Sequence, residues 1–251
     1  MRQSHPFLDR RGPIAFAHRG GSLEAEENTM PAFERAVALG YGHVELDVHL
    51  TKDGEVVVHH DASLARVFGV DRLVSDLTMA DLAGITSKGG ATVPRFADVL
   101  SSFPDLKINI EAKSDEVVEP LAEVIRHADA LDRIGIGSFS ASRTARARAL
   151  LGPDLIWSPA HGGVARMVAA GYGLPFRPEF RCIQVPVRWK GIPVVTPKFV
   201  RAAHQAGVQV HVWTVDDEAE MINLLDMGVD GLMTDRPTLL REVLIRRGEW
   251  D

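Results

Sequence analysis

Short apolar, β-branched runs alternate with longer amphipathic stretches along most of the chain. The short runs have the composition of buried strands, and the stretches between them have the apolar spacing of helices. The pattern predicts eight strands, at Ile14–Ala17, His43–Leu50, Lys107–Glu111, Arg133–Ser138, Leu155–Ser158, Cys182–Val185, Val208–Trp213 and Val229–Met233.

Residues typical of helix starts and helix ends lie between these runs. A hydroxyl or carboxylate side chain can accept from the first free amides of a helix, and glycine commonly follows the last turn. Predicted starts are Thr29, Ser140, Thr196 and Asp216, and predicted ends are Gly40, Gly207 and Gly228.

Regular alternation of strand and helix is typical of α/β proteins with a parallel sheet. Eight repeats in 251 residues favour closure into a TIM (β/α)8 barrel, with an open doubly wound sheet as the alternative. We expect a single domain over residues 1–251. The stretch between His60 and Lys107 is too long for a simple crossover, so we predict an insertion at about 61–105 on the carboxyl-terminal face of the barrel.

Composition and charge limit the classes of partner and the cellular location that this protein can be expected to have. The formal net charge is −6, which does not favour nucleic acid as a partner. Cys182 is the only cysteine, so an internal disulfide is excluded. Charges interrupt the first eleven residues, and no stretch offers about 18 uninterrupted apolar residues. We therefore expect a soluble, cytoplasmic protein with no stable membrane anchor.

Two carboxylates share one face of a predicted strand. Period-two alternation places Glu45 and Asp47 opposite the apolar side chains of His43–Leu50. In a barrel that apolar face lies under the helices, so the carboxylates face the interior and need cations or a metal as partners. They are candidate ligands for a hard divalent cation. The alternative is a half-exposed antiparallel strand with no site.

The next strand repeats the arrangement. Glu111 and Lys113 share a face opposite Ile108, Ile110 and Ala112, which adds a third inward carboxylate. Lys113 either meets an anionic substrate or forms a salt bridge inside the barrel. Trp213 also faces inward by this alternation, as a pocket wall or as barrel packing.

Two histidines follow apolar runs. His18 and Arg19 precede two glycines, a combination suited to proton transfer and to binding a phosphate. His60 is followed by Asp61, which can orient its ring. Five other histidines are interpreted as structural or exposed (His5, His49, His127, His161 and His204), two as ambiguous (His43 and His59), and His211 faces inward by the alternation of its strand.

An ordered set of motifs resembles the glycerophosphodiester phosphodiesterase family across nearly the whole chain. The motifs are His18-Arg19-Gly20, Glu27-Asn28-Thr29, Glu45-Leu46-Asp47-Val48, Thr51-Lys52-Asp53-Gly54, His60-Asp61, Glu111-Ala112-Lys113, Ser138-Phe139, Val212-Trp213-Thr214-Val215 and Gly231-Leu232-Met233-Thr234-Asp235-Arg236-Pro237. The resemblance implies a TIM barrel, one divalent cation (Mg²⁺ or Ca²⁺), and hydrolysis of small-molecule glycerophosphodiesters to sn-glycerol 3-phosphate and an alcohol.

The resemblance also implies roles for individual residues. The metal ligands would be Glu45, Asp47 and Glu111; the acid and base pair His18 and His60; the phosphate-binding residues Arg19 and Lys113; and the walls of the glycerol pocket Phe139 and Trp213. It suggests that the glycerol 2-hydroxyl attacks phosphorus to form a cyclic phosphate, which water then opens.

Two positions depart from the family pattern. Glu26 replaces the proline of the Pro-Glu-Asn-Thr motif, which questions the rigidity of that loop. After Leu64, the sequence Ala65-Arg66-Val67-Phe68 stands where the family has an Arg-Thr pair, and the insertion matches the family poorly. Rival functions are a lysophospholipase D or sphingomyelinase-D-like lyase on the same barrel, and a binding module without turnover.

Overall fold

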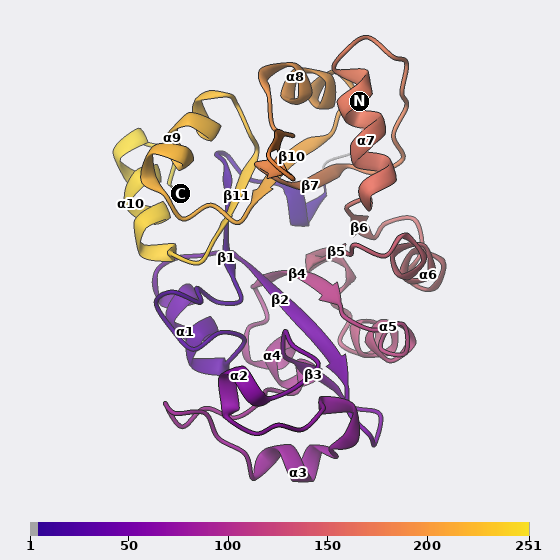
Figure 1. Ribbon diagram of the computed structural model, residues 1–251, viewed down its shortest axis with the longest axis vertical. Coiled ribbons are helices and arrows are strands. Elements are labelled where there is room, and N and C mark those ends of the chain that lie inside the picture. Colours follow the sequence, from indigo (N-terminus) through magenta and orange to yellow (C-terminus); the bar gives the residue numbers. More distant parts are fainter. Residues whose placement is uncertain (1–4, 251) are drawn as a thin grey trace.

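Eight parallel strands form a nearly closed barrel with helices around it (Figure 1). This computed structural model describes residues 5–250, so Met1–Ser4, the start of the charged amino-terminal stretch, and Asp251 lie outside the described residues. The barrel strands are β1 Ile14–His18, β2 His43–Leu50, β4 Lys107–Ala112, β5 Ile134–Gly137, β6 Ile156–Trp157, β7 Cys182–Pro186, β10 Gln209–Trp213 and β11 Gly231–Thr234.

The first and last barrel strands pair with each other. Ile14 lies opposite Gly231 in a parallel β1–β11 register, and the ladders continue in the order β6-β5-β4-β2-β1-β11-β10-β7. Strands β6 and β7 lie at the two ends of this order and have no ladder between them. There the backbone N–H of Gln184 donates to Ser158 Oγ at 2.8 Å. The barrel prediction is therefore confirmed, and the open doubly wound sheet is wrong.

Seven helices of at least nine residues accompany the barrel in the described part of the chain: α1 Met30–Ala38, α5 Val118–His127, α6 Ala141–Leu151, α7 His161–Ala170, α8 Pro197–Gln205, α9 Glu218–Asp226 and α10 Pro237–Arg247. Thr29, Ser140 and Thr196 cap α1, α6 and α8 as predicted. The predicted start of α9 at Asp216 is wrong, because the cap is Asp217. The Asp216 carboxylate instead accepts from Thr234 Oγ1 and the Asp235 amide, at 3.0 and 2.7 Å, and holds the end of β11.

The segment between β2 and β4 leaves the barrel directly after β2. The short strand β3, Val56–Val58, runs antiparallel to β2, and the segment continues through α2 Ala65–Phe68, η2 Val74–Asp76, α3 Met79–Ala83 and α4 Phe96–Ser102. It has its own apolar cluster, made of Val57, Leu64, Phe68, Val74, Leu77, Leu82 and Val93. His59 and His60 thus follow a strand that returns toward the barrel rim.

Side-chain alternation divides the barrel into an outer core and an inner filling. Val44, Leu46 and Val48 of β2 pack in the large apolar cluster that includes helix residues. Inside, Phe7 of η1, Pro6–Leu8, contacts Phe16 with ring centroids 6.3 Å apart and closes the amino-terminal end. A Cβ at Gly135 would lie 2.6 Å from the Phe7 ring, so glycine makes room for this plug. In residues 5–250, none of the helices has the length and hydropathy to cross a bilayer.

Candidate active site

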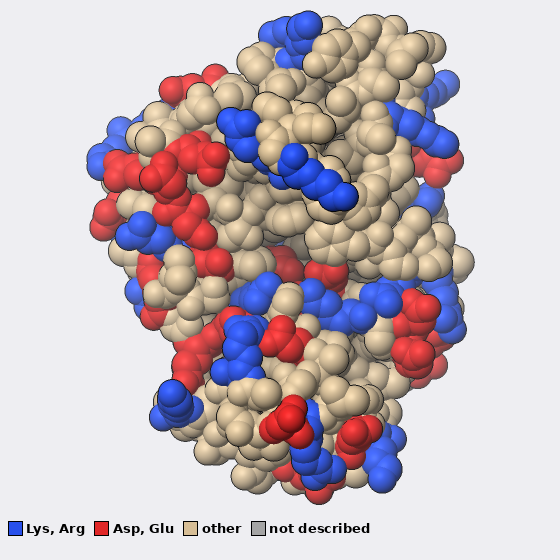
Figure 2. All heavy atoms as spheres, in the orientation of Figure 1, with Lys and Arg blue, Asp and Glu red and all other residues tan. Residues whose placement is uncertain are grey.

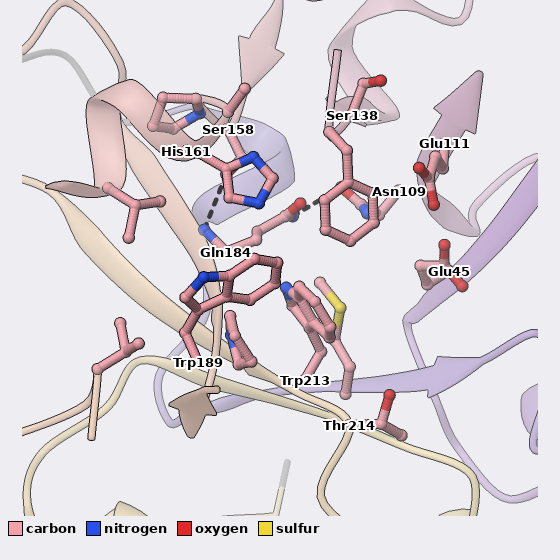
Figure 3. Close-up of a pocket in the computed structure, with 18 of the residues that line it drawn as sticks. Glu45, Asn109, Glu111, Ser138, Ser158, His161, Gln184, Trp189, Trp213 and Thr214 are labelled. Carbon is pink, nitrogen blue, oxygen red and sulfur yellow. Dashed lines mark hydrogen bonds between the residues drawn. The ribbon is translucent and has the colours of Figure 1, made fainter. Parts of the chain in front are cut away.

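A cavity of about 650 Å³ opens at the carboxyl-terminal end of the barrel strands, and its two halves differ in chemistry. Figure 3 shows Glu45 and Glu111 on one side and His161, Trp189 and Trp213 on the other. The polar half contains His18, Arg19, Glu45, Asp47, His60, Glu111 and Lys113. The apolar half contains Phe139, Val164, Val168, Trp189, Ile192 and Trp213.

The three candidate ligand carboxylates come from two neighbouring strands. Asp47 of β2 lies directly opposite Glu111 of β4 in parallel register, and Glu45 is two residues before Asp47 on the same face. Glu45 is 6% and Asp47 1% exposed, and all three line the cavity. The predicted inward orientation is confirmed, and the half-exposed antiparallel alternative is wrong.

Burial shapes the protonation of this group. Loss of hydration and the neighbouring Asp47 raise the pKa of Glu45 to about 8. Burial opposes ionisation of Asp47 too, but Lys113 and Arg19 outweigh it and hold the pKa of Asp47 below its ordinary value. Lys113 Nζ lies 2.8 Å from both Asp47 Oδ1 and Glu111 Oε2. Lys113 therefore forms the salt bridges expected inside the barrel while also facing the cavity.

The donor chemistry fits a hard divalent cation. All three side chains offer carboxylate oxygens, and the buried Glu45 Oε2 has no hydrogen-bond partner in the described part of the chain, its nearest cation being His18 Nε2 at 3.6 Å. As the side chains stand, no set of three or more His, Cys, Asp or Glu residues within 5–250 is arranged to hold a metal ion. Lys113 contacts two of the three carboxylates, so a bound metal cation and the ammonium group of Lys113 would compete for the same carboxylate oxygens.

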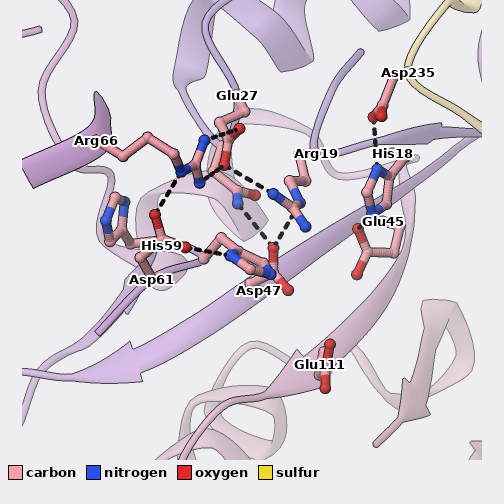
Figure 4. A network of polar contacts seen from close by, with 12 residues as sticks. His18, Arg19, Glu27, Glu45, Asp47, His59, Asp61, Arg66, Glu111 and Asp235 are labelled. Atoms are coloured by element: carbon pink, nitrogen blue, oxygen red, sulfur yellow. Dashed lines mark hydrogen bonds and ion pairs between the residues drawn. The ribbon is translucent and has the colours of Figure 1, made fainter. Parts of the chain in front are cut away.

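His18 is held between two carboxylates at the end of β1 (Figure 4). Its Nδ1 lies 2.6 Å from Asp235 Oδ1, and its Nε2 lies toward Glu45. Burial lowers the pKa of His18, but Glu45 and Asp235 together outweigh burial and raise it above the ordinary value. No role was predicted for Asp235 from the sequence, although its place directly after the last barrel strand is where catalytic residues of such barrels gather.

His60 is oriented by a second carboxylate. Its Nδ1 lies 2.6 Å from Asp61 Oδ1, as predicted, and Asp61 Oδ2 accepts from Arg66 Nε at 2.6 Å. Arg66 also donates to both oxygens of Glu27, each at 2.7 Å. The Arg66 that departs from the family pattern thus ties the His60 loop to the loop after β1 (Figure 4).

The β1–α1 loop carries Arg19 and Asn28, both in the left-handed region with φ of 53° and 56°. Arg19 Nε lies 3.3 Å from Asp47 Oδ2, and Asn28 Nδ2 donates to the same oxygen at 3.0 Å. Glu26, in place of the family's proline, accepts from Ser87 Oγ at 2.5 Å and from the Gly89 amide at 2.8 Å. These bonds fasten the loop to the β2–β4 segment.

Four aromatic rings form a row of neighbours along the wall of the apolar half, in the spatial order Trp213, Phe139, His161 and Trp189. Phe139 lies 5.6 Å from Trp213 and 5.7 Å from His161, and His161 lies 4.8 Å from Trp189, measured between centroids. Trp213 lines the cavity and also packs against the inner barrel cluster. His161 is exposed, as expected, yet it lines the cavity; as the first residue of the helix after β6, it could have been placed at this face.

The two ambiguous histidines have structural contacts. His43 is buried at the barrel floor, where its Nε2 lies 2.8 Å from the Phe7 carbonyl. His59 Nε2 lies 3.1 Å from the Ser63 carbonyl. Neither ring lines the cavity.

Arg143 of α6 supports the site from outside the cavity. Its Nη1 donates to the carbonyls of Ala112 and Lys113 at 3.2 and 2.8 Å. It therefore holds the end of the strand that carries Glu111.

An eight-stranded barrel with two carboxylate-bound histidines beside buried acids defines a TIM-barrel enzyme. The model of the glycerophosphoryl diester phosphodiesterase family matches residues 18–239. The chain is 41% identical over 252 residues to "Probable glycerophosphodiester phosphodiesterase 2" of Mycobacterium tuberculosis, covering 98% of this chain and 96% of that protein. The chain therefore belongs to the glycerophosphoryl diester phosphodiesterase family, whose members are phosphoric diester hydrolases, and the resemblance drawn from the motifs is confirmed.

Solved structures agree on the fold. A glycerophosphodiester phosphodiesterase from Agrobacterium tumefaciens aligns with a TM-score of 0.75 at 23% identity, over 92% of this chain and 99% of that one. An Oleispira antarctica phosphodiesterase, solved with the product sn-glycerol-3-phosphate, aligns with a TM-score of 0.78 at 23% identity, over 93% and 97% of the two chains.

Proposed function

We propose that this protein hydrolyses glycerophosphodiesters to sn-glycerol 3-phosphate and an alcohol, with His18 and His60 as the acid and base. The observation that carries the proposal is the convergence of both histidines on one cavity, each with Nδ1 held 2.6 Å from a carboxylate oxygen. Such a contact fixes the ring and leaves Nε2 for proton transfer. Family membership supports the same reaction.

Charge in the polar half suits a phosphodiester. Arg19 and Lys113 are cationic side chains that line the cavity, and each also contacts Asp47. Fixed cations beside a phosphate stabilise the charge that develops on its oxygens during displacement. We propose that both bind the phosphate of the substrate.

Glu45, Asp47 and Glu111 are the residues we propose to hold one divalent cation, Mg²⁺ or Ca²⁺. When bound, the cation would supply charge stabilisation for the phosphoryl group and lower the pKa of a nearby hydroxyl. The protein's contribution is to collect three carboxylates on two adjacent strands and to leave Glu45 Oε2 without a hydrogen bond.

The proposed first step is attack of the glycerol 2-hydroxyl on phosphorus. One histidine accepts the hydroxyl proton while the new O–P bond forms, and the bond from phosphorus to the leaving alcohol breaks. The other histidine donates its proton to that alcohol oxygen. In the second step the histidines exchange roles: one accepts a proton from water, and the other returns a proton to the 2-oxygen as the cyclic phosphate opens.

The direct test is product analysis. Purified protein is incubated with glycerophosphocholine and with glycerophosphoethanolamine, each with divalent metal or with chelator, and the phosphorus-containing product is identified by ³¹P NMR. We expect sn-glycerol 3-phosphate from both substrates and loss of turnover with chelator. Phosphocholine as product, or full activity in chelator, would contradict the proposal.

A second candidate is lysophospholipase D activity, favoured by the apolar half of the cavity. Trp189 and Ile192 continue the wall formed by Phe139 and Trp213 toward the outside, which gives room for an acyl chain on the glycerol. Supplying lysophosphatidylcholine distinguishes the two, because lysophosphatidic acid would be formed only by this activity. Formation of a cyclic product that persists would indicate the lyase instead, and binding without turnover would indicate a binding module.

Some expectations stay predictions. A single domain with an insertion, a small-molecule substrate with no nucleic-acid partner, and a cytoplasmic location remain proposals that rest on composition and family.

A further inference from the structure

Charge is distributed very unevenly along this acidic chain. Residues 155–215, from β6 through β10, contain seven Lys or Arg residues and a single acidic residue, Glu179, whereas the whole chain carries a net charge of −6. In Figure 2 the part of the face over α7 and α8 is mainly tan and blue, while red atoms gather over α9 and around the lower part.

Apolar side chains are exposed in the same region. Strands β8, Arg188–Trp189, and β9, Ile192–Pro193, form a small antiparallel hairpin whose residues 188–193 are all exposed. Trp189 is 44% and Ile192 69% exposed. Beyond α7, Tyr172 and Leu174 are 72% and 61% exposed, and Lys198 Nζ lies 5.0 Å from the Tyr172 ring.

The hairpin borders the mouth of the cavity. Trp189 and Ile192 line its apolar half, so the exposed apolar surface continues directly into the site. Arg188 and Lys190 flank Trp189, and neither takes part in an ion pair among the described residues. Their charges are available to a partner.

We propose that this hairpin surface, residues 188–193, docks on an anionic lipid bilayer and turns the cavity mouth toward it. Tryptophan and tyrosine favour the headgroup level of a bilayer, and Lys and Arg beside them are attracted to anionic headgroups. Each basic side chain contributes about 1 kcal/mol near such a surface, so a few charges together with apolar insertion give reversible binding. The docking goes beyond the proposed hydrolysis and does not require turnover.

The test measures co-sedimentation with vesicles of phosphatidylglycerol and phosphatidylcholine, with pure phosphatidylcholine vesicles for comparison. We expect binding that needs phosphatidylglycerol and weakens as salt rises. The double variant Arg188→Gln/Lys190→Asn removes two charges, and asparagine suits the φ of 49° at position 190. Its affinity for the mixed vesicles should fall roughly 30-fold.

A matched control removes the same charge elsewhere. Lys52→Gln/Lys88→Gln alters two exposed residues of the β2–β4 segment and should leave vesicle binding unchanged. For the apolar contribution, Ile192→Ser, at a hairpin residue 69% exposed, should weaken binding, while Leu73→Ser, at a residue 45% exposed, should not.

The outcomes separate docking from catalysis. No binding of the unaltered protein to mixed vesicles at low salt, or equal weakening by the hairpin and control variants, would overturn the proposal. Arg188 and Lys190 do not line the cavity, so glycerophosphocholine hydrolysis should be unchanged in the hairpin variant. Intact vesicle binding by a protein that hydrolyses no glycerophosphodiester would support docking and reject the proposed function.

Discussion

At the residue scale, the site depends on carboxylates that set the state of their neighbours. Asp235 and Asp61 each contact one histidine Nδ1, and Lys113 lies between Asp47 and Glu111. Each buried charge has an opposite charge nearby, which is the condition for keeping ionised groups inside a barrel. Glu45 has only His18, with Nε2 at 3.6 Å from Oε2, as an ion-pair partner among the described residues; its pKa is raised, and that oxygen has no hydrogen bond.

Asp235 is a positioning residue for His18. In Asp235→Asn the carboxylate that contacts Nδ1 is replaced by an amide, so the ring loses its fixed tautomer and its charge partner. We expect kcat on glycerophosphocholine to fall roughly 10- to 100-fold with little change in KM. The control is Asp132→Asn at an exposed position. An increase in KM with unchanged kcat would contradict a role in orienting His18.

Buried His43 should make the free energy of unfolding fall as the pH is lowered below about 6.5. Burial lowers the pKa of His43 to about 3, so between the ordinary histidine pKa near 6.5 and that value the unfolded chain binds a proton that the folded chain does not. Stability from neutral His43 is present above about pH 6.5 and is lost as the pH falls below it.

The variant His43→Gln isolates this effect. Its free energy of unfolding should lie below that of the unaltered protein at pH 7.5, and the difference should shrink by about 1.4 kcal/mol for each pH unit below 6.5. Urea unfolding from pH 7.5 to 5 measures it, with exposed His127→Gln as control. A pH-independent difference would reject the account of this residue.

At the element scale, strands were more predictable than loops. The inward placement of Glu45, Asp47 and Glu111 follows from period-two alternation, because a strand fixes the direction of each side chain. The helix starts at Thr29, Ser140 and Thr196 followed from local cap chemistry, and Asp216 was misplaced because it bonds to β11 instead. Contacts between loops far apart in sequence have no local signal.

The contact of Glu26 with Ser87 and Gly89 is such a case. Both bonds involve a charged acceptor, so Glu26→Gln should lower the free energy of unfolding by about 1.5 to 3 kcal/mol and speed hydrogen exchange at the Gly89 amide. Glu34→Gln, at an exposed residue of α1, is the control and should change neither. Unchanged exchange at Gly89 in Glu26→Gln would show that this bond does not hold the loop.

At the scale of the whole molecule, the barrel joins two chemically different halves. Strands β1, β2 and β4 supply the charged half of the cavity, and the region from β6 to β10 supplies apolar wall and basic surface. The seam of the barrel lies within the second of these regions, between β6 and β7, where the Ser158 hydroxyl takes the place of a strand ladder. Charge along the sequence could have predicted this division, but the weak seam depends on how few residues β6 contains.

Ser158→Ala tests that seam. The substitution leaves the backbone N–H of Gln184 without its acceptor. An unpaired donor away from water lowers the free energy of unfolding by about 1 to 3 kcal/mol. Urea unfolding should show this loss, with exposed Ser101→Ala as the control. Equal stability of the two variants would mean that another acceptor closes the barrel.

The central claim is that His18 and His60 transfer the protons of phosphodiester hydrolysis. The most direct measurement is kcat on glycerophosphocholine at saturating divalent metal, together with thermal unfolding, for His18→Ala, His60→Ala and the exposed control His127→Ala. We expect each cavity variant to lose about 10²-fold or more in kcat with little change in Tm, and His127→Ala to match the unaltered protein. Near-normal turnover in either cavity variant, or a loss of activity that parallels a loss of Tm, would contradict the account.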